Sequence, residues 1–245
     1  MTRLSVNLNK VALLRNQRDL EMPSVLRAAQ VCIDAGAEGI TVHPRPDQRH
    51  TRPRDVRELA AAIRVELNVE GNPTPSFLDL VRELRPAQCT LVPDDPDQRT
   101  SDHGWTLRAP GGPTPDAKRL EPVLRELRDL EIRTSLFMDP DLEQIAAVAE
   151  LGADRIELYT EAYATAYGGP EQTACFEVYR AAADRARECG LGINAGHDLN
   201  LQNLALFLSI PDVLEVSIGH ALTADALFMG LDAAVRAYLA ITASA

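Results

Sequence analysis

Short apolar segments alternate with longer helical patterns along the whole chain, and this alternation limits the folds available to it. Apolar and polar residues that alternate one by one indicate a strand, and apolar residues that recur every three to four positions indicate a helix. The expected strands are residues 4–9, 39–43, 66–70, 88–92, 133–138, 155–159, 192–195 and 214–218. The helices expected to follow them are residues 23–36, 55–64, 76–84, 115–130, 139–151, 170–189, 201–208 and 221–241. This order of elements predicts an α/β protein, a (β/α)8 TIM barrel.

The length of the chain and a faint internal repeat favour the barrel. The 245 residues are close to the roughly 250 typical of this fold, and we expect a single barrel domain over residues 1–245. Residues 34–43 and 150–159 both read as a helix end, a glycine, a short loop and a strand, as expected of a recurring unit. A doubly wound open sheet is the alternative, but the sequence has neither a GxGxxG nor a P-loop signature.

Three connections are expected to be irregular. Residues 10–18 form a short basic connection, and residues 160–169 form a loop rich in tyrosine. Residues 93–113 form a long segment rich in Pro, Asp and Gly that contains Thr100, His103 and the only tryptophan, Trp105. Loops of that length are usually functional or mobile.

Composition excludes several classes of protein. The net charge of −11 argues against a general nucleic-acid or membrane-surface binder, whose footprint would be basic. No apolar run approaches the roughly 18 residues that span a bilayer, and the N-terminus shows no signal peptide. The cysteines, at positions 32, 89, 175 and 189, lack metal-binding spacing, so we expect reduced thiols in a cytoplasmic protein.

The strand faces that should point into the barrel are unusually polar. They carry Asn7, Asn9, Thr41, His43, Glu66, Asn68, Glu70, Glu157, Asn194, Glu215 and Ser217. Buried carboxylates are costly unless they are paired or hydrogen-bonded, so a polar lumen indicates catalysis or ligand binding. The alternative is a structural hydrogen-bond network, which we favour for Glu66 and Glu215 because they lie near the strand starts.

Histidines gather at the expected carboxyl ends of the strands, where a barrel keeps its active site. They are His43 and His50 after the second strand, His103 in the long segment, and His197 and His220 after the last two strands. Histidine exchanges protons near neutral pH, so acid–base catalysis is favoured. A catalytic metal is the rival interpretation, but there is no HxH or HExxH spacing.

Anion-binding groups lie beside these histidines. Gly196 and Gly219 end the last two strands, where backbone amides of a barrel commonly hold phosphate. Arg18, Arg45 and Arg49 could hold a second anion. Two phosphate sites indicate either a bisphosphate or two phosphorylated substrates.

Several motifs follow one another along almost the whole chain. They are Asn7-x-Asn9-Lys10-x-Ala12-x-x-Arg15-Asn16, Gly39 to His50, Asn68-x-Glu70, Leu91-Val92-Pro93, Glu157-x-x-Thr160, Asn194-Ala195-Gly196-His197 and Ile218-Gly219-His220. Together they resemble the pyridoxine 5′-phosphate synthase family. The resemblance implies a barrel with extra helices, a cytoplasmic homo-octamer, and no metal or organic cofactor. It also implies a transferase of vitamin B6 (pyridoxine) biosynthesis that joins 1-deoxy-D-xylulose 5-phosphate to 3-amino-2-oxopropyl phosphate, giving pyridoxine 5′-phosphate, phosphate and water.

The resemblance also implies roles for individual residues. His43 and Glu70 resemble the proton acceptors, His197 the proton donor, and Glu157 the carboxylate that stabilises the transition state. Contacts to the aminoketone phosphate are implied for Asn7, Arg18, Gly219 and His220. Contacts to the deoxyxylulose phosphate are implied for Arg45, His50 and Thr100.

The chain departs from the best-known form of the motifs at three places. Asn9-Lys10 stands where that form has Asp-His, a pair that touches the deoxyxylulose phosphate, and Lys10 can still donate to an anion. Glu161 and Asp198 each replace a glycine. Asp198 is predicted to contact substrate, and it places a negative charge near an expected phosphate.

Two other functions remain open from the sequence. One is a phosphosugar aldolase or isomerase on the same barrel. The other is an inactive relative that binds phosphorylated metabolites, against which the joint presence of His43, Glu70 and His197 argues. The family reaction needs repeated proton transfer and donors for phosphate, but no enzyme lysine, because its substrate supplies the amine.

Overall fold

The computed structural model describes residues 1–18, 20–94, 98 and 100–244. Within them, eight parallel strands close into a barrel in the order β1-β10-β9-β8-β7-β4-β3-β2. The strands are β1 (Arg3–Asn7), β2 (Gly39–Val42), β3 (Glu66–Gly71), β4 (Gln88–Leu91), β7 (Arg133–Met138), β8 (Arg155–Tyr159), β9 (Gly192–Gly196) and β10 (Val213–Ile218). Pairing of Val6 with both Ile40 of β2 and Ile218 of β10 closes the ring. The predicted (β/α)8 barrel is therefore confirmed.

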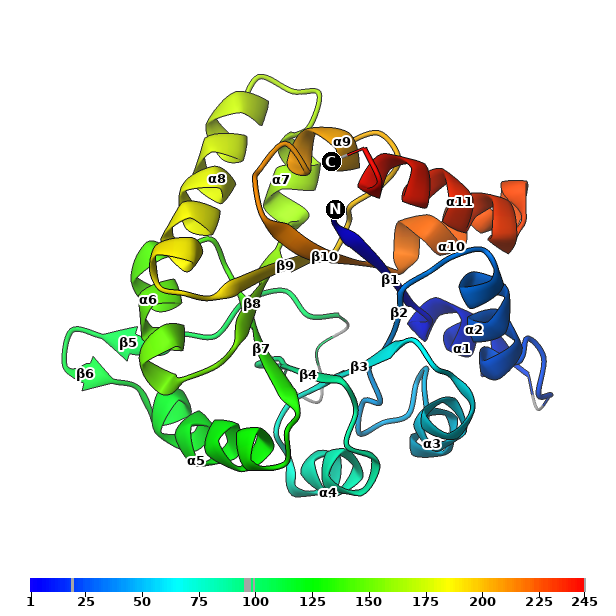
Figure 1. Ribbon diagram of the computed structural model, residues 1–245, viewed down its shortest axis with the longest axis horizontal. Coiled ribbons are helices and arrows are strands. Elements are labelled where there is room, and N and C mark those ends of the chain that lie inside the picture. The colour runs from blue at the N-terminus through cyan, green and yellow to red at the C-terminus, as the bar shows by residue number, and fades with distance from the viewer. Residues whose placement is uncertain (19, 95–97, 99, 245) are drawn as a thin grey trace.

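Helices surround this ring on its outer side (Figure 1). They are α1 (Asn9–Arg15), α2 (Val25–Asp34), α3 (Pro53–Ala62), α4 (Pro75–Leu84), α5 (Pro115–Asp129), α6 (Leu142–Leu151), α7 (Glu161–Ala166), α8 (Gln172–Glu188), α9 (Leu204–Phe207), α10 (His220–Met229) and α11 (Leu231–Thr242). Among the described residues, none of these helices is long and apolar enough to cross a membrane.

Two helices lie where the sequence predicted irregular connections. Helix α1 occupies most of residues 10–18, and its residue Arg15 is buried because the guanidinium pairs with the Asp55 carboxylate at 2.5 Å. Helix α7 occupies part of residues 160–169, where Tyr163 is buried among aromatic rings. The extra helices implied by the resemblance are thus present, although apolar periodicity alone did not place them.

Other boundaries also differ from the prediction. The closing helix is two helices, α10 and α11, because Gly230 between them adopts φ 81°, which glycine reaches without steric cost. Part of the long segment forms a short antiparallel pair, β5 (Arg108–Ala109) and β6 (Gly112–Pro113). Residues 95–97 and 99 of that segment lie outside the described residues.

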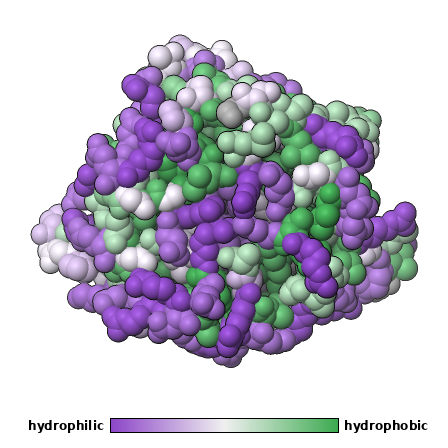
Figure 2. Space-filling view, in the orientation of Figure 1, coloured by the Kyte–Doolittle hydropathy of each residue, from purple (hydrophilic) through white to green (hydrophobic). Residues whose placement is uncertain are grey.

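The apolar core lies between the strands and the helices. Leu4, Val6, Ile40 and Val42 on neighbouring strands are buried there, as alternation along each strand requires. The other strand face forms the lumen, and Figure 2 shows a hydrophilic centre in this view of the ring. The polar lumen expected from the sequence is therefore present.

Hydrogen bonds satisfy much of this lumen. Asn68 donates to the hydroxyl of Thr41 at 3.4 Å and accepts from the hydroxyl of Thr90 at 3.0 Å. At the amino end of the barrel, Glu66 pairs with Arg3 at 2.5 Å and also with Arg133. The carboxylate of Glu215 accepts from the amide of Gln88 at 3.3 Å. These contacts support the structural interpretation of Glu66 and Glu215.

Candidate active site

A cavity of about 590 Å³ opens at the carboxyl ends of the strands. It brings together residues from distant parts of the chain that the sequence analysis selected. The selected residues that line it are Asn7, Asn9, Lys10, His43, Arg45, Arg49, His50, Glu70, Thr100, Glu157, His197, Asp198, Ser217, Gly219 and His220. We call it the catalytic cavity.

Arg18 does not line the catalytic cavity. It follows α1 in a turn and its side chain is exposed. The arginine of this region that turns inward is Arg15, whose partner Asp55 lies in α3. The structure therefore leaves Arg18 apart from the other predicted substrate contacts within this chain.

Asn9, the first residue of α1, holds the backbone of His43 at the end of β2. Its backbone N–H donates to Oδ1 of Asn9 at 2.9 Å, and the hydroxyl of Thr51 donates to the same oxygen at 3.1 Å. Burial, reinforced by the neighbouring His50, Arg45 and Arg49, holds the pKa of His43 well below its usual range. The imidazole is therefore neutral and able to accept a proton.

Glu70 and Glu157 are two buried carboxyl groups in the lumen. Burial, reinforced by Glu157 and Asp94, raises the pKa of Glu70 well above its usual range. Burial and Glu215 raise the pKa of Glu157 to about 8. Both shifts favour the protonated carboxyl group, and a cation entering beside them would favour the carboxylate.

Gly196 makes room for Glu157. A Cβ atom on Gly196 would lie 2.4 Å from Oε1 of Glu157, closer than nonbonded atoms approach. Glycine at the end of β9 therefore serves close packing against a lumen carboxyl group, besides the anion role that the sequence suggested.

His197 follows Gly196 and faces the cavity from the opposite side. Its Nδ1 lies 2.9 Å from Oδ2 of Asp198, and its Nε2 lies 3.2 Å from the hydroxyl of Thr100. The ring of Tyr159 packs edge-on against the imidazole, with centroids 4.9 Å apart. Thr100 and His197 thus link the long segment to the end of β9.

Cationic groups line the cavity near β2. Arg45 donates through Nη2, and Arg49 through Nη1, to the backbone oxygen of Gln98, each at 2.9 Å. Burial, with the charges of Arg45 and Lys10, lowers the pKa of His50 to about 4. Among the described residues, Nδ1 of His50 is buried without a hydrogen-bond partner. A buried polar atom of this kind is suited to a ligand.

Gly219 begins the wall nearest β1. It precedes helix α10, whose first amides can receive an anion. A Cβ atom on Gly219 would lie 3.1 Å from Cβ of Asn7, so this approach favours glycine. Asn7 in turn donates to Glu70 at 3.3 Å, which connects the anion-binding wall to the lumen carboxyl.

Asp94 is a site residue that the sequence analysis missed. Its Oδ2 accepts from Nη1 of Arg45 at 2.7 Å and from the hydroxyl of Ser101 at 3.1 Å, and it lies 3.6 Å from Nε2 of His43. The signal was available, because Asp94 directly follows the Leu91-Val92-Pro93 motif at the end of β4.

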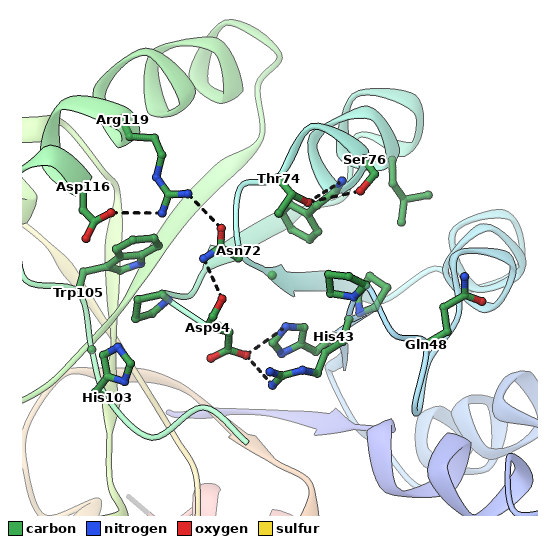
Figure 3. A pocket seen from close by; sticks show the side chains of 18 of the residues that line it. His43, Gln48, Asn72, Thr74, Ser76, Asp94, His103, Trp105, Asp116 and Arg119 are labelled. Atoms are coloured by element: carbon green, nitrogen blue, oxygen red, sulfur yellow. Dashed lines mark hydrogen bonds and ion pairs between the residues drawn. The ribbon is translucent and has the colours of Figure 1, made fainter. Parts of the chain in front are cut away.

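A second cavity of about 580 Å³ shares His43 and Arg45 with the catalytic cavity, and Figure 3 shows His43 and Asp94 on its wall. Arg119 spans it, donating to Asn72 at 3.2 Å, with its guanidinium 5.3 Å from the centre of the Trp105 ring. His103 lines this second cavity and not the catalytic one.

Solved structures of other enzymes share the fold. The phosphoribosyl anthranilate isomerase of Thermotoga maritima superposes with a TM-score of 0.65 at 15% identity, over 100% of both chains. A tryptophan synthase chain from M. tuberculosis gives a TM-score of 0.64 at 13% identity, over 98% of this chain and 93% of its own. At these identities the likeness concerns the barrel alone.

Sequence relatives are much closer. A pyridoxine 5′-phosphate synthase of Albidiferax ferrireducens is 52% identical over 248 residues, which cover 97% of this chain and 96% of the relative. One of Bacteroides fragilis is 51% identical over 239 residues, which cover 97% of this chain and 98% of the relative. The family model described as pyridoxal phosphate biosynthesis protein PdxJ matches residues 4–244. The family and enzyme class predicted from the motifs are confirmed, and the chain belongs to the PdxJ family of pyridoxal phosphate biosynthesis proteins.

Proposed function

We propose that this chain joins 1-deoxy-D-xylulose 5-phosphate to 3-amino-2-oxopropyl phosphate, forming pyridoxine 5′-phosphate, phosphate and water. The observation that carries the proposal is that one cavity combines proton-transfer groups with anion-binding groups on two walls. Arg45, Arg49 and His50 form one wall, and Gly219 and His220 form the other. Two phosphorylated substrates would be held with their reacting carbons over the lumen between these walls.

The proton-transfer roles follow from the states of the side chains. His43 is neutral because burial depresses its pKa. Its unprotonated ring nitrogen is therefore available to accept a proton at the start. Glu70 becomes an acceptor once the ammonium group of the aminoketone enters, since a cation favours the carboxylate form. His197 donates from the opposite side, and Glu157 stabilises positive charge that develops in the lumen.

The two phosphates are assigned to the two walls. Arg45, His50 and Thr100 hold the deoxyxylulose phosphate, with Asn9 and Lys10 beside them. The unpartnered Nδ1 of His50 supports this assignment. Asn7, Gly219 and His220 hold the aminoketone phosphate at the start of α10. Arg18 stays a predicted contact to the same phosphate, although it lies outside the catalytic cavity of this chain.

Assembly and location are further parts of the proposal. The family resemblance supports a homo-octamer that works in the cytoplasm without a metal or organic cofactor. Light scattering on the pure protein should give a mass about eight times the 26.8 kDa of one chain. A mass near that of a single chain would contradict the octamer.

A two-substrate turnover assay tests the reaction. The protein should release phosphate and form a pyridine chromophore only when both substrates are present. A phosphosugar aldolase or isomerase would act on one sugar phosphate alone, and a Schiff-base aldolase would be trapped by borohydride at Lys10. An inactive relative would bind both phosphates without turnover. Either of these results would overturn the proposal.

A further inference from the structure

The turn that carries His197 and Asp198 has an unusual backbone. His197 adopts φ 80° and Asp198 adopts φ 60°, both in the left-handed region that residues with a side chain seldom occupy. Such a conformation costs free energy and persists only where the surroundings enforce it. Here two consecutive residues adopt it, directly after β9.

Side chains from two neighbouring segments hold this turn in place. The hydroxyl of Thr160 donates to the backbone oxygen of Gly196 at 2.8 Å and also to that of His197. The amide of Asn203 donates to the backbone oxygen of Asp198 at 3.1 Å. The turn is therefore fixed from both sides by groups that do not line the catalytic cavity.

The fixed turn aims the Asp198 carboxylate at the imidazole. Oδ2 of Asp198 lies 2.9 Å from Nδ1 of His197, so the carboxylate accepts the Nδ1–H proton. The other ring nitrogen, Nε2, then faces the cavity and the hydroxyl of Thr100 at 3.2 Å. A carboxylate that accepts from one ring nitrogen fixes the tautomer and the orientation of the imidazole. It thereby fixes which nitrogen faces a ligand.

The charges around this pair give the carboxylate a second effect. Lys10 and His220 approach Asp198 from the start of α1 and the start of α10. Across the ring, Tyr159 donates its hydroxyl to Glu161 at 2.7 Å, with Asp102 also nearby, and Glu157 lies below Gly196. The hydrogen bond from His197 lowers the pKa of Asp198, which is therefore ionised at neutral pH. Without the Asp198 carboxylate, the charge that remains on that side of the ring would be the Lys10 ammonium.

We propose that Asp198 is a positioning residue that acts through His197. Its carboxylate accepts Nδ1–H, turns Nε2 toward the substrate, and places a negative charge beside the ring while His197 carries the proton that it donates. This inference rests on the donor role proposed above for His197. The motif position alone suggested that the Asp198 carboxylate contacts the substrate directly. The role proposed here is a different one, because the carboxylate acts on His197. It also accounts for an acidic side chain beside an expected phosphate site.

Proton NMR of the histidine rings tests the pair without any turnover. In Asp198→Asn the ring geometry can remain, since the amide oxygen still accepts from Nδ1–H, but the charge is lost. The His197 ring signal, identified by its loss in His197→Gln, should change its titration relative to the wild type, because a neutral amide does not stabilise the protonated ring as a carboxylate does. Asp198→Gly should show the same change, because glycine adopts this backbone easily and adds no charge.

Asp212 supplies a matched control. It also has a positive φ, 62°, but it lies just before β10 and pairs with Arg187 at 3.0 Å. Asp212→Asn and Asp212→Gly should leave the His197 titration in place. A titration unchanged in both Asp198 variants would overturn the proposal.

Kinetics supply the second measurement. In Asp198→Asn, kcat should fall roughly ten- to a hundredfold, and its alkaline limb should move to lower pH, while each KM stays within about threefold. A raised KM for the aminoketone phosphate with an unchanged kcat and pH profile would make Asp198 a substrate ligand and overturn the proposal. If the wild type makes no product, the proposed function fails, while the NMR titration still decides whether Asp198 controls the His197 proton.

Discussion

Nδ1 of His43 lies 4.0 Å from Oε2 of Glu70, and both side chains are buried at the carboxyl ends of adjacent strands. Burial acts on the two groups in opposite directions, because it disfavours the charged form of each. The pKa of His43 is lowered and that of Glu70 is raised, so the uncharged form of each is favoured. A cationic substrate would shift Glu70 toward the carboxylate, the form that can take up a proton.

Glu70→Gln should abolish most turnover without unfolding the protein. The amide keeps the shape of the side chain and can still accept from Asn7, but it cannot take up a proton. We expect kcat to fall on the order of a hundredfold or more. The melting temperature should hold or rise, because a buried ionisable group has been removed. Steady-state kinetics beside a melting curve measures both effects.

Glu66→Gln is the control for this variant. Glu66 lies on the same strand but at the amino end of the barrel, paired with Arg3 and Arg133. It should melt earlier and turn over almost normally once folded. If Glu70→Gln behaves in that way instead, Glu70 is structural and its catalytic assignment fails.

Gly196→Ala should disable the site through Glu157. The new methyl group would lie 2.4 Å from Oε1 of Glu157 and 3.2 Å from the backbone oxygen of Ser217, so the carboxyl group must move. Displacements of about 1 Å at a reacting centre can cost on the order of a hundredfold in rate. We expect kcat to fall by about that factor while the barrel remains folded. Kinetics and circular dichroism together measure this.

Gly169→Ala is the matched control, because its Cβ would meet only the backbone oxygen of Ala166 at 3.3 Å. It should leave kcat near the wild-type value. Full activity in Gly196→Ala would mean that the position of Glu157 does not matter to the reaction.

The sequence predicted the barrel because apolar residues recur with the period of a strand or a helix wherever that element buries one face. It did not predict α1, since a buried arginine looks like a surface residue until Asp55, forty positions away, is brought beside it. It did not predict the second cavity, because the packing of Arg119 over Trp105 depends on two separate segments. Residues at strand ends were predictable, since a parallel barrel collects them at one end.

His50→Gln should remove an acid-sensitive part of the stability. The pKa of His50 is about 4 in the folded protein, against an ordinary value of 6.5, so the unfolded chain takes up a proton first. Its contribution is fully present above pH 6.5 and is lost as the pH falls toward 4. The wild type should lose roughly 1–3 kcal/mol more than His50→Gln over this interval.

Urea unfolding at several pH values between neutral and 4 provides the measurement. His103→Gln is the control, because that histidine is exposed beside Asp102 and outside the catalytic cavity. Parallel curves for the wild type and His50→Gln would contradict the buried, neutral state of His50.

Glu157→Gln should remove a loss of stability that the wild type shows on the alkaline side, opposite in direction to the effect of His50. The pKa of Glu157 is raised from 4.5 to about 8 in the folded protein, so the unfolded chain releases its proton first as the pH rises. Stability is therefore lost between those two pH values, by an amount on the order of a few kcal/mol.

The glutamine variant carries no ionisable group at position 157. It should match the wild type in free energy of unfolding at pH 5 and exceed it at pH 8, when both are measured by urea titration. Because no substrate is added in this experiment, the result depends on the ionisation of Glu157 and not on substrate binding. An equal difference at both pH values would mean that Glu157 is already ionised in the folded protein at pH 5, and that the protonated lumen inferred here is wrong.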